Sequence, residues 1–275
     1  MKYFIPVVMA GLLVACSENR SAVPEKHFGG ERYDSTALHV ALLPTHDCLP
    51  IYYAAHKGIY KKLGLKLQIA SYQSQLDCDT ALLGWVADGG MADRVRLAGY
   101  GKKAAGLQTM WTANNRWQLW VCSTLRIKNV KDLSGRTIAV SRQSAENAVL
   151  EQVLKASSVK YDEVYLPQIN NVKLRASMLA GNQVDATLLV WPYTSLAASA
   201  GHRCLYVQKF KDSNAVFVMK RQRLERTGMR RKWQLFEKGR RMAIDSLRLK
   251  GPAAYADILK SVYNLPAEVA DTLCY

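Results

Sequence analysis

The chain has few acidic residues for its length of 275, and it lacks the long apolar runs of integral membrane proteins. Only 22 Asp and Glu residues oppose 38 Lys and Arg residues, which gives a formal net charge of +16. No stretch reaches 18 consecutive apolar residues, and this excludes a polytopic membrane protein. The contents of 49% hydrophobic and 22% charged residues are typical of a globular protein, and the length favours two lobes over one.

Several signatures of catalysis and metal binding are also missing. The chain contains no GxSxG elbow, no HExxH and no phosphate-binding GxxxxGK[ST]. No His/Cys cluster has the spacing of a zinc site, and the six cysteines form no CxxC pair. We therefore expect no enzymatic activity, no cofactor and no metal. Ser141, His46 and Asp47 are the residue types of a hydrolase triad, so an envelope hydrolase stays open as an alternative.

The N-terminus has the anatomy of a lipoprotein signal. One cation, Lys2, precedes a short apolar stretch that ends at Ala15 and Cys16, as in a bacterial lipobox. We expect a signal peptide over residues 1–15, acylation of Cys16, and a polar, flexible tether over residues 16–36. The alternative is an ordinary secretory signal with an incidental cysteine. Either way the protein is expected in the cell envelope, where a Cys48–Cys78 disulfide would be permitted.

The rest of the chain carries the same order of elements twice. A strand-like run at residues 38–43 is followed by a helix, a strand, a second helix and then Gly84-x-x-x-Asp88. The same order starts again at residues 137–140 and ends at Gly181-x-x-x-Asp185. From the start of the first strand to the glycine is 46 positions in the first half and 44 in the second. This repeat predicts two similar α/β lobes, each a mostly parallel sheet flanked by helices.

The second lobe is expected to lie within the first in the sequence. Strand-like runs lead into and out of it, which predicts a two-strand hinge. We assign residues 37–120 plus 206–275 to lobe 1 and residues 121–205 to lobe 2. The largely helical stretch at residues 221–273 is expected to pack back on lobe 1. Because ligands of such sheets bind beyond the carboxyl ends of the strands, one cleft between the lobes is expected.

Polar and aromatic side chains near the ends of the predicted strands are candidate ligand contacts. The candidates are Thr45, His46, Asp47, Asp88, Asn114, Ser141, Gln143, Ser144, Asn170, Trp191 and Tyr193. The turn at residues 141–144 precedes a helix whose free N–H groups suit a sulfonate, phosphate or carboxylate. Helix capping is an equal alternative for Asp47, whereas Ser144 can cap its own helix and contact a ligand at the same time. A structural role is the alternative for His46, a turn role for the asparagines, and core packing for the aromatic residues.

Four motifs in the same order resemble a known family. Residues 50–65 match its first helix and the glycine-containing turn that follows, and residues 131–140 match its entry to the second lobe. Residues 179–186 and 191–193 match two further motifs. The chain is similar to the periplasmic solute-binding lipoproteins of ABC importers, in the group that binds sulfonates, nitrate or thiamine-pyrimidine precursors. The resemblance implies the two-lobe periplasmic-binding-protein fold, a small organic ligand, a permease with its ATPase as partners, and a monomer.

The excess of positive charge is concentrated near the C-terminus. Residues 220–250 hold twelve Lys and Arg against three acidic residues, a net of +9. An exported protein without a recognition module is not expected to bind nucleic acid. We expect a solvated basic face that lies against anionic lipid or a permease surface, so a basic, surface-adhering lipoprotein is the second alternative function.

Overall fold

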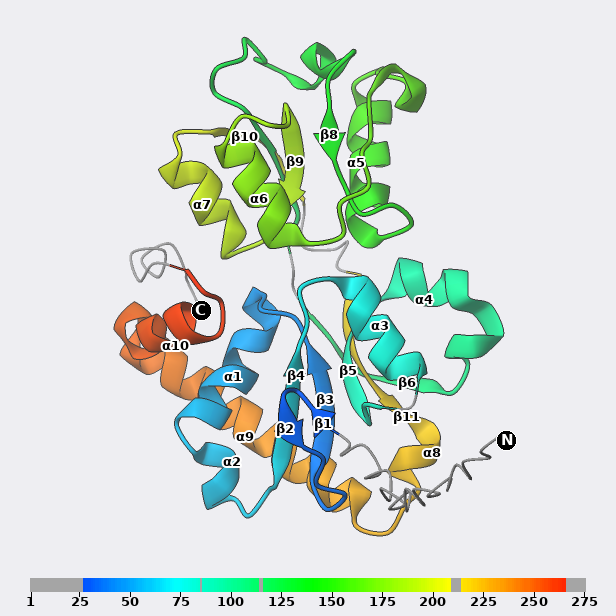
Figure 1. The fold of residues 1–275 in the computed structure, drawn as a ribbon, viewed down its shortest axis with the longest axis vertical. Helices are drawn as coiled ribbons and strands as arrows, with labels where there is room; N and C mark the ends of the chain where they lie inside the picture. Colours follow the sequence, from blue (N-terminus) through cyan, green and yellow to red (C-terminus); the bar gives the residue numbers. More distant parts are fainter. Residues whose placement is uncertain (1–26, 85, 114–115, 209–213, 266–275) are drawn as a thin grey trace, which may run out of the picture.

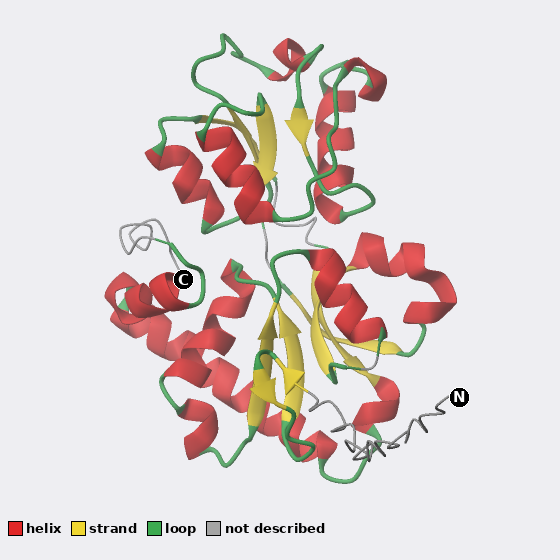
Figure 2. Cartoon of the chain, viewed as in Figure 1, coloured by secondary structure: helices red, strands yellow, loops and turns green. Residues whose placement is uncertain are grey.

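The computed structural model describes residues 27–84, 86–113, 116–208 and 214–265. Two lobes are stacked along the long axis, each with a sheet and flanking helices (Figures 1 and 2). The expected two-lobe α/β fold is confirmed. The predictions for the signal peptide, Cys16 and Asn114 lie outside the described residues. Within the described part, no helix has both the length and the apolar character needed to cross a membrane.

Lobe 1 is built on a five-stranded sheet with the order β4-β3-β5-β11-β6. β3 pairs in parallel with β4 and β5, whereas β11 runs antiparallel to both β5 and β6. Its strands are β3 (Leu38–Leu42), β4 (Leu67–Ser71), β5 (Gly89–Asp93), β6 (Leu107–Thr112) and β11 (Ala215–Lys220). Four of the five strands therefore point the same way, as a mostly parallel sheet requires. A small hairpin of β1 (His27–Phe28) and β2 (Glu31–Arg32) precedes them. The expected flexible tether over residues 16–36 is therefore wrong for residues 27–36, which are folded against β4.

Helices cover both sides of this sheet, with α1, α2 and α9 on one side and α3 and α4 on the other (Figure 1). The helices are α1 (Leu49–His56), α2 (Ile59–Lys62), α3 (Gln75–Leu83), α4 (Arg94–Tyr100), α8 (Arg221–Leu224), α9 (Met229–Lys250) and α10 (Ala256–Ser261). Short 3-10 turns span His46–Cys48, Gly101–Ala104 and Pro252–Tyr255. The expected packing of the C-terminal helices on lobe 1 is seen in the long contact between α1 and α9.

An aromatic cluster fixes α9 to the sheet. Phe217 of β11 packs against Trp233 and Phe236 of α9, with ring centroids 5.6 Å and 5.3 Å apart. Tyr60 stacks on Phe236 from the other side at 5.5 Å. A side chain at Gly239 would place its Cβ 2.5 Å from the Tyr60 ring, so glycine is required there. The cluster therefore joins β11, α9 and α2 into one core.

Lobe 2 has a four-stranded sheet with the order β10-β7-β9-β8. Its strands are β7 (Gln118–Val121), β8 (Ile138–Ala139), β9 (Ala186–Leu189) and β10 (Arg203–Val207), and its helices are α5 (Ala145–Ala156), α6 (Val172–Ala180) and α7 (Tyr193–Ser199). Short 3-10 turns span Val130–Leu133 and Tyr161–Glu163. The repeat predicts a strand between the two helices of this half, but the segment between α5 and α6 makes only single parallel bridges to the β8 segment, at Tyr165 and Gln168.

The lobe boundaries differ slightly from the expected ones. β7 and β10 both belong to the lobe 2 sheet, and Gln118 pairs with Leu189 on one side and Val207 on the other. Residues 118–120 and 206–207 therefore lie with lobe 2 rather than lobe 1. The chain crosses between the lobes twice, from β6 to β7 and from β10 to β11. β7 and β10 pair along their whole length within the lobe 2 sheet. The boundary between the lobes therefore lies before β7 and after β10.

The two aspartates of the sequence repeat hold equivalent positions in the two lobes. Asp88 Oδ2 accepts a hydrogen bond from His39 N at 3.0 Å, and Asp185 Oδ2 accepts one from Thr137 N at 2.8 Å. Asp88 N in turn donates to His39 O at 2.8 Å, and Asp185 N donates to Thr137 O at 3.0 Å. Each aspartate thus fixes the start of one strand to the start of its parallel neighbour. The repeat in the sequence reflects a repeated structural unit.

Candidate functional site

A cavity of about 70 Å³ lies between the lobes, where the carboxyl ends of strands from both sheets meet. Lobe 1 contributes residues that follow β3 and end β5, and lobe 2 contributes the turns that lead into α5 and α6. Its polar lining consists of Thr45, Gln75, Asp93, Ser141, Ser144, Glu146, Asn170 and Arg175. The cavity is therefore shared between the lobes, at the place that the topology predicts for a ligand.

Four of the residues predicted from the sequence meet at this cavity: Thr45, Ser141, Ser144 and Asn170. The Ser141 hydroxyl donates to Asn170 Oδ1 at 3.1 Å, which joins the loop after β8 to the loop before α6. The Ser144 hydroxyl donates to the carbonyl of Ser141 at 2.6 Å and accepts from Asn147 N at 3.3 Å. Ser144 thus caps α5 and lines the cavity at the same time.

A second group of predicted residues forms an interlobe contact and does not line the cavity. His46 N donates to Trp191 O at 3.3 Å, and the two rings meet edge-on with centroids 6.0 Å apart. Asp47 Oδ1 lies 3.9 Å from His46 Nδ1. Trp191 also packs against Tyr255 and Tyr263 of lobe 1. These side chains join the lobes through aromatic packing.

Gln143 and Tyr193 also lie away from the cavity lining. Gln143 is exposed and has a φ of 53°, as a residue in a tight turn before a helix. Tyr193 is fully buried in the hydrophobic core, and this burial raises the pKa of its hydroxyl. Its ring therefore fills the interior of the protein instead of presenting a face to a ligand.

Asp88 lies at the opposite end of the lobe 1 sheet from the cavity, because it precedes β5 and the cavity is reached from the end of that strand. Its Oδ2 is 3.1 Å from His39 Nδ1, and its Oδ1 is 3.3 Å from Arg223 Nε. Burial alone would raise the pKa of Asp88, but the hydrogen bonds from His39 and the charge of Arg223 outweigh burial and lower it. Asp88 therefore belongs to a buried ion cluster at the amino ends of the strands.

The start of α5, which was expected to hold a ligand anion, is occupied by a carboxylate of the protein. Asp93, the last residue of β5, accepts a hydrogen bond from Ala145 N at 2.7 Å through its Oδ2. Its Oδ1 accepts from Val95 N at 2.8 Å and so caps α4. Burial raises the pKa of Asp93, and these backbone donors oppose the rise. Asp93 was not predicted as a site residue from the sequence. The only available signal was its position between a strand and a helix.

A buried ion pair forms another wall of the cavity. Glu146 and Arg175 are 2% and 1% exposed, and Glu146 Oε2 is 2.5 Å from Arg175 Nη2. Glu146 Oε1 accepts from Ser141 N, and Arg175 Nη1 donates to Ile169 O at 2.5 Å. Burial raises the pKa of Glu146 and lowers the pKa of Arg175, while their mutual attraction opposes both shifts. Both residues lie on helices without a local motif, so no signal in the sequence could pair them.

Acidic groups outnumber basic groups around the cavity. Two carboxylates, Asp93 and Glu146, face one guanidinium, that of Arg175. Arg175 Nε is buried and has no hydrogen-bond partner among the described residues. Carboxylate oxygens accept hydrogen bonds and disfavour a second negative charge in a buried site. The site therefore suits a neutral or cationic ligand that carries N–H donors.

The described part of the chain shows no assembled metal or thiol chemistry. No group of three His, Cys, Asp or Glu side chains within it could hold a metal ion. Cys48 and Cys78 are buried free thiols, so the disulfide that the sequence left open is absent. Burial raises the pKa of the Cys48 thiol to about 12 and also raises that of Cys78. Both thiols therefore remain protonated and unreactive at neutral pH.

Fold and cavity together define a two-lobe binding-protein architecture. Residues 45–219 match the family described as NMT1/THI5 like, and the chain belongs to this family. The resemblance predicted from the sequence is thereby confirmed. A search of curated proteins finds no match.

Solved structures show the same fold at low sequence identity. The alkanesulfonate-binding protein SsuA from Xanthomonas axonopodis pv. citri, bound to MOPS, has a TM-score of 0.71 and 20% identity, with 87% of this chain and 83% of that chain covered. The periplasmic aliphatic sulphonate binding protein SsuA from Escherichia coli has a TM-score of 0.65 and 19% identity, with coverages of 86% and 81%. The periplasmic nitrate-binding protein NrtA from Synechocystis PCC 6803 has a TM-score of 0.71 and 14% identity, with coverages of 85% and 68%.

Proposed function

We propose that this protein is the solute-binding component of an ABC importer, which closes its two lobes on a small organic ligand and delivers it to a permease. The observation that supports this function is the cavity between the lobes, with polar groups from both sheets in its wall. Closure on a ligand would link occupancy to recognition by the permease and its ATPase. The protein would act as a monomer.

We favour a pyrimidine-like ligand over a sulfonate-like or nitrate-like one. Asp93 already occupies the helix end that would attract an anion, and Glu146 adds a second carboxylate. An anionic ligand would have to enter beside both carboxylates in a buried site, which costs several kcal/mol unless a cation compensates. A ring with amino groups could instead donate hydrogen bonds to these oxygens.

The cavity as it stands is smaller than a ring. Benzene occupies an apolar cavity of about 150 Å³, twice the volume of about 70 Å³ found between the lobes. A ring would therefore bind only after the lobes separate and the bond between Asp93 and Ala145 breaks. In the complex, an amino group of the ligand would take the place of Ala145 N as the donor to Asp93.

Binding without turnover is the activity that we propose. The Ser141 hydroxyl donates to Asn170, so the triad considered from the sequence is not assembled around His46. No cysteine lines the cavity among the described residues, and burial keeps the Cys48 thiol protonated. These observations support a binding protein over the hydrolase alternative.

A thermal-shift experiment tests the ligand class. A chain that begins at residue 17 would be heated with 4-aminopyrimidine, ethanesulfonate or nitrate, each at up to 10 mM. A ligand at 100 times its Kd stabilises the folded state by about 2.7 kcal/mol, so we expect the Tm to rise by about 5 °C with 4-aminopyrimidine alone. Stabilisation by ethanesulfonate or nitrate alone would contradict the pyrimidine-like ligand. Consumption of a ligand would contradict binding without turnover. Binding to anionic vesicles, with no binding of any small ligand, would favour the alternative of a basic, surface-adhering lipoprotein.

The membrane anchor is proposed from the sequence motif at Cys16. Acyl chains on this cysteine would hold the folded lobes at the surface of a membrane in the cell envelope. We expect Cys16→Ser to move the protein from the membrane fraction to the soluble fraction, whereas Ser17→Ala leaves it bound. A Cys16→Ser protein that stays membrane-bound in high salt would overturn the anchor.

A further inference from the structure

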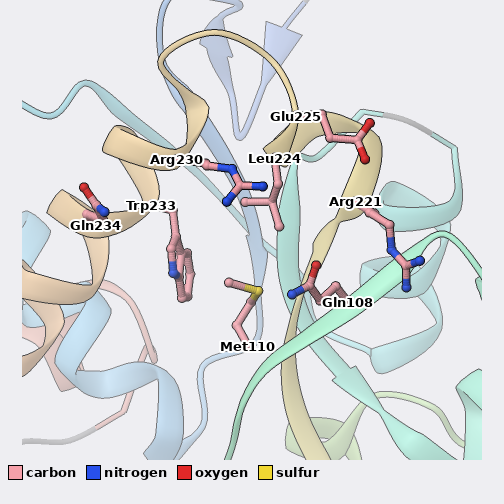
Figure 3. A pocket seen from close by; sticks show the side chains of 8 residues that line it. All are labelled: Gln108, Met110, Arg221, Leu224, Glu225, Arg230, Trp233 and Gln234. Atoms are coloured by element: carbon pink, nitrogen blue, oxygen red, sulfur yellow. The ribbon is translucent and has the colours of Figure 1, made fainter.

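A second and larger cavity, of about 210 Å³, lies on lobe 1 between β6, α8 and α9 (Figure 3). None of its lining residues borders the cavity between the lobes. Met110, Leu224 and Trp233 form its apolar part, and Arg221 and Arg230 supply positive charge. The cavity thus combines an aromatic surface with two cations at a distance from the proposed solute site.

The two arginines of this cavity are exposed cations. Among the described residues, neither Arg221 nor Arg230 makes a side-chain hydrogen bond or an ion pair, and Glu225, the acidic residue of the lining, pairs with neither. Arg240, also on α9, is neutralised by contrast, because it donates a hydrogen bond to Glu237 at 2.7 Å. The N-terminus of α9 carries the positive end of the helix dipole. No acidic residue in the first turn of α9 offsets this positive field.

The aromatic surface is held in place by the core. Trp233 is half-buried and stacks on Phe217 with centroids 5.6 Å apart, while Phe236 packs beside it at 5.5 Å. In Figure 3 the indole ring, the Met110 thioether and the Arg230 guanidinium border the same space. A ring bound there would meet a fixed indole and a polarizable sulfur, both of which favour aromatic partners. Little side-chain freedom would be lost on binding.

The volume limits the ligand to about one ring. An apolar cavity of about 150 Å³ holds benzene, so a cavity of about 210 Å³ has room for a single ring and a small substituent. Arg221 and Arg230 are exposed and have no side-chain partner among the described residues, so they favour an anionic substituent on that ring. Guanidinium groups bind carboxylate, sulfonate and phosphate through charge-assisted hydrogen bonds.

We propose that this cavity is a second binding site, for a small aromatic anion. The ring of the ligand packs against Trp233 and Met110, and its carboxylate, sulfonate or phosphate is bound by the arginines at the rim. The site does not depend on the proposed transport function, since the two cavities share no residue.

The test is a titration of the chain with 4-fluorobenzenesulfonate, followed by ¹⁹F NMR. We expect saturable binding that weakens at least tenfold in the double variant Arg221→Gln/Arg230→Gln, as loss of charge-assisted hydrogen bonds requires. The matched control is Arg226→Gln/Arg231→Gln, which removes the same charge from two exposed residues of the same segment outside the lining. Its affinity is expected to stay within twofold of the wild type.

Two further arms separate this site from the cavity between the lobes. Neutral 4-fluorobenzyl alcohol should bind at least tenfold more weakly than the sulfonate, and saturating 4-aminopyrimidine should leave the sulfonate signal unchanged. Equal losses in the two double variants would show a nonspecific charge effect and overturn the site. Displacement by 4-aminopyrimidine would also overturn it, because the probe would then occupy the cavity between the lobes.

Discussion

Asp93 of lobe 1 and Ala145 of lobe 2 are joined by a hydrogen bond of 2.7 Å across the cavity. The same carboxylate caps α4 through Val95 N, so one side chain satisfies the starts of two helices in different lobes. The lobes also meet at a bridge between Ser74 and Asn171. These contacts join the two lobes directly, and Asp93 is the charged part of that contact.

The substitution Asp93→Asn should favour separation of the two lobes. An asparagine keeps an oxygen to cap α4, but its amide nitrogen would face Ala145 N, so that two donors oppose each other. A hydrogen bond to a charged group contributes about 1.5–3 kcal/mol, which predicts a shift of roughly 10- to 100-fold toward open forms. Small-angle X-ray scattering should then show a larger radius of gyration.

The matched control for this variant is Asp132→Asn. Asp132 also accepts backbone hydrogen bonds, from Lys128 N and Asn129 N, but it lies within lobe 2. Its scattering curve should equal that of the wild type. An unchanged radius of gyration in Asp93→Asn would show that aromatic and backbone contacts alone hold the lobes together.

Arg175→Met should destabilise the protein far more than the removal of both members of its ion pair. The single change leaves Glu146 buried without its cation, which costs about 3–5 kcal/mol in the free energy of unfolding. The double variant Glu146→Leu/Arg175→Met removes the stranded charge and should recover at least half of that loss. Urea unfolding of the two single variants, the double variant and the wild type measures the coupling. Additive losses would contradict a tightly coupled pair.

Lys220 should make stability depend on alkaline pH. The ammonium group is buried, and burial together with Arg223 lowers its pKa to about 8, against the opposing charge of Asp88. Between this value and about 10.4 the unfolded chain binds more protons, so the free energy of unfolding rises with pH. We expect a rise of at most about 1.5 kcal/mol between pH 8 and 9.5, measured by urea unfolding. In Lys220→Met this rise in the free energy of unfolding should vanish. Parallel pH profiles of the wild type and the variant would contradict a lowered pKa of Lys220.

The equivalent aspartates of the two lobes should differ in their contribution to stability. Asp88 is buried among His39 and Arg223, whereas Asp185 is only half-buried and accepts one side-chain hydrogen bond, from Thr137 N. We expect Asp88→Ala to cost about 3 kcal/mol or more and Asp185→Ala about 1 kcal/mol, by urea unfolding at pH 7.

Acid provides a second readout for the same pair of variants. Because the pKa of Asp88 is lowered in the folded state, its contribution is present above the unfolded value of about 3.9 and is lost as the pH falls through the folded value. The difference between the wild type and Asp88→Ala should therefore shrink below pH 4. Equal losses in the two alanine variants at pH 7 would contradict the ion cluster.

Much of the fold could be predicted because its signals are local. Ser144 caps the start of α5, and Gly181 follows the last residue of α6. Both residue types are local signals of helix ends. The repeated order of elements predicted two lobes, and the hydrogen bonds of Asp88 and Asp185 give that repeat a structural cause. Capping and periodicity act within a few residues, so they can be recognised without knowledge of the fold.

The site could be predicted only in part, because its contacts are long-range. Asp93 meets Ala145 across 52 positions, and Glu146 meets Arg175 across 29. The first pair depends on how the two lobes meet, and the second depends on the folding of lobe 2. No local pattern in the sequence encodes either contact. Asp88 was placed near the cleft because its motif adjoins a strand, but the motif precedes that strand, so the residue lies at the other end of the sheet.

The position of β11 has a consequence for the order in which the chain is made. β11 lies between β5 and β6 and pairs with both, yet it is synthesised after every strand of lobe 2. As the chain leaves the ribosome from its N-terminus, lobe 2 acquires all its strands while the sheet of lobe 1 still has a gap. β5 and β6 then present unpaired edges until residues 215–220 emerge. The lobe that begins the protein is thus the last to be completed.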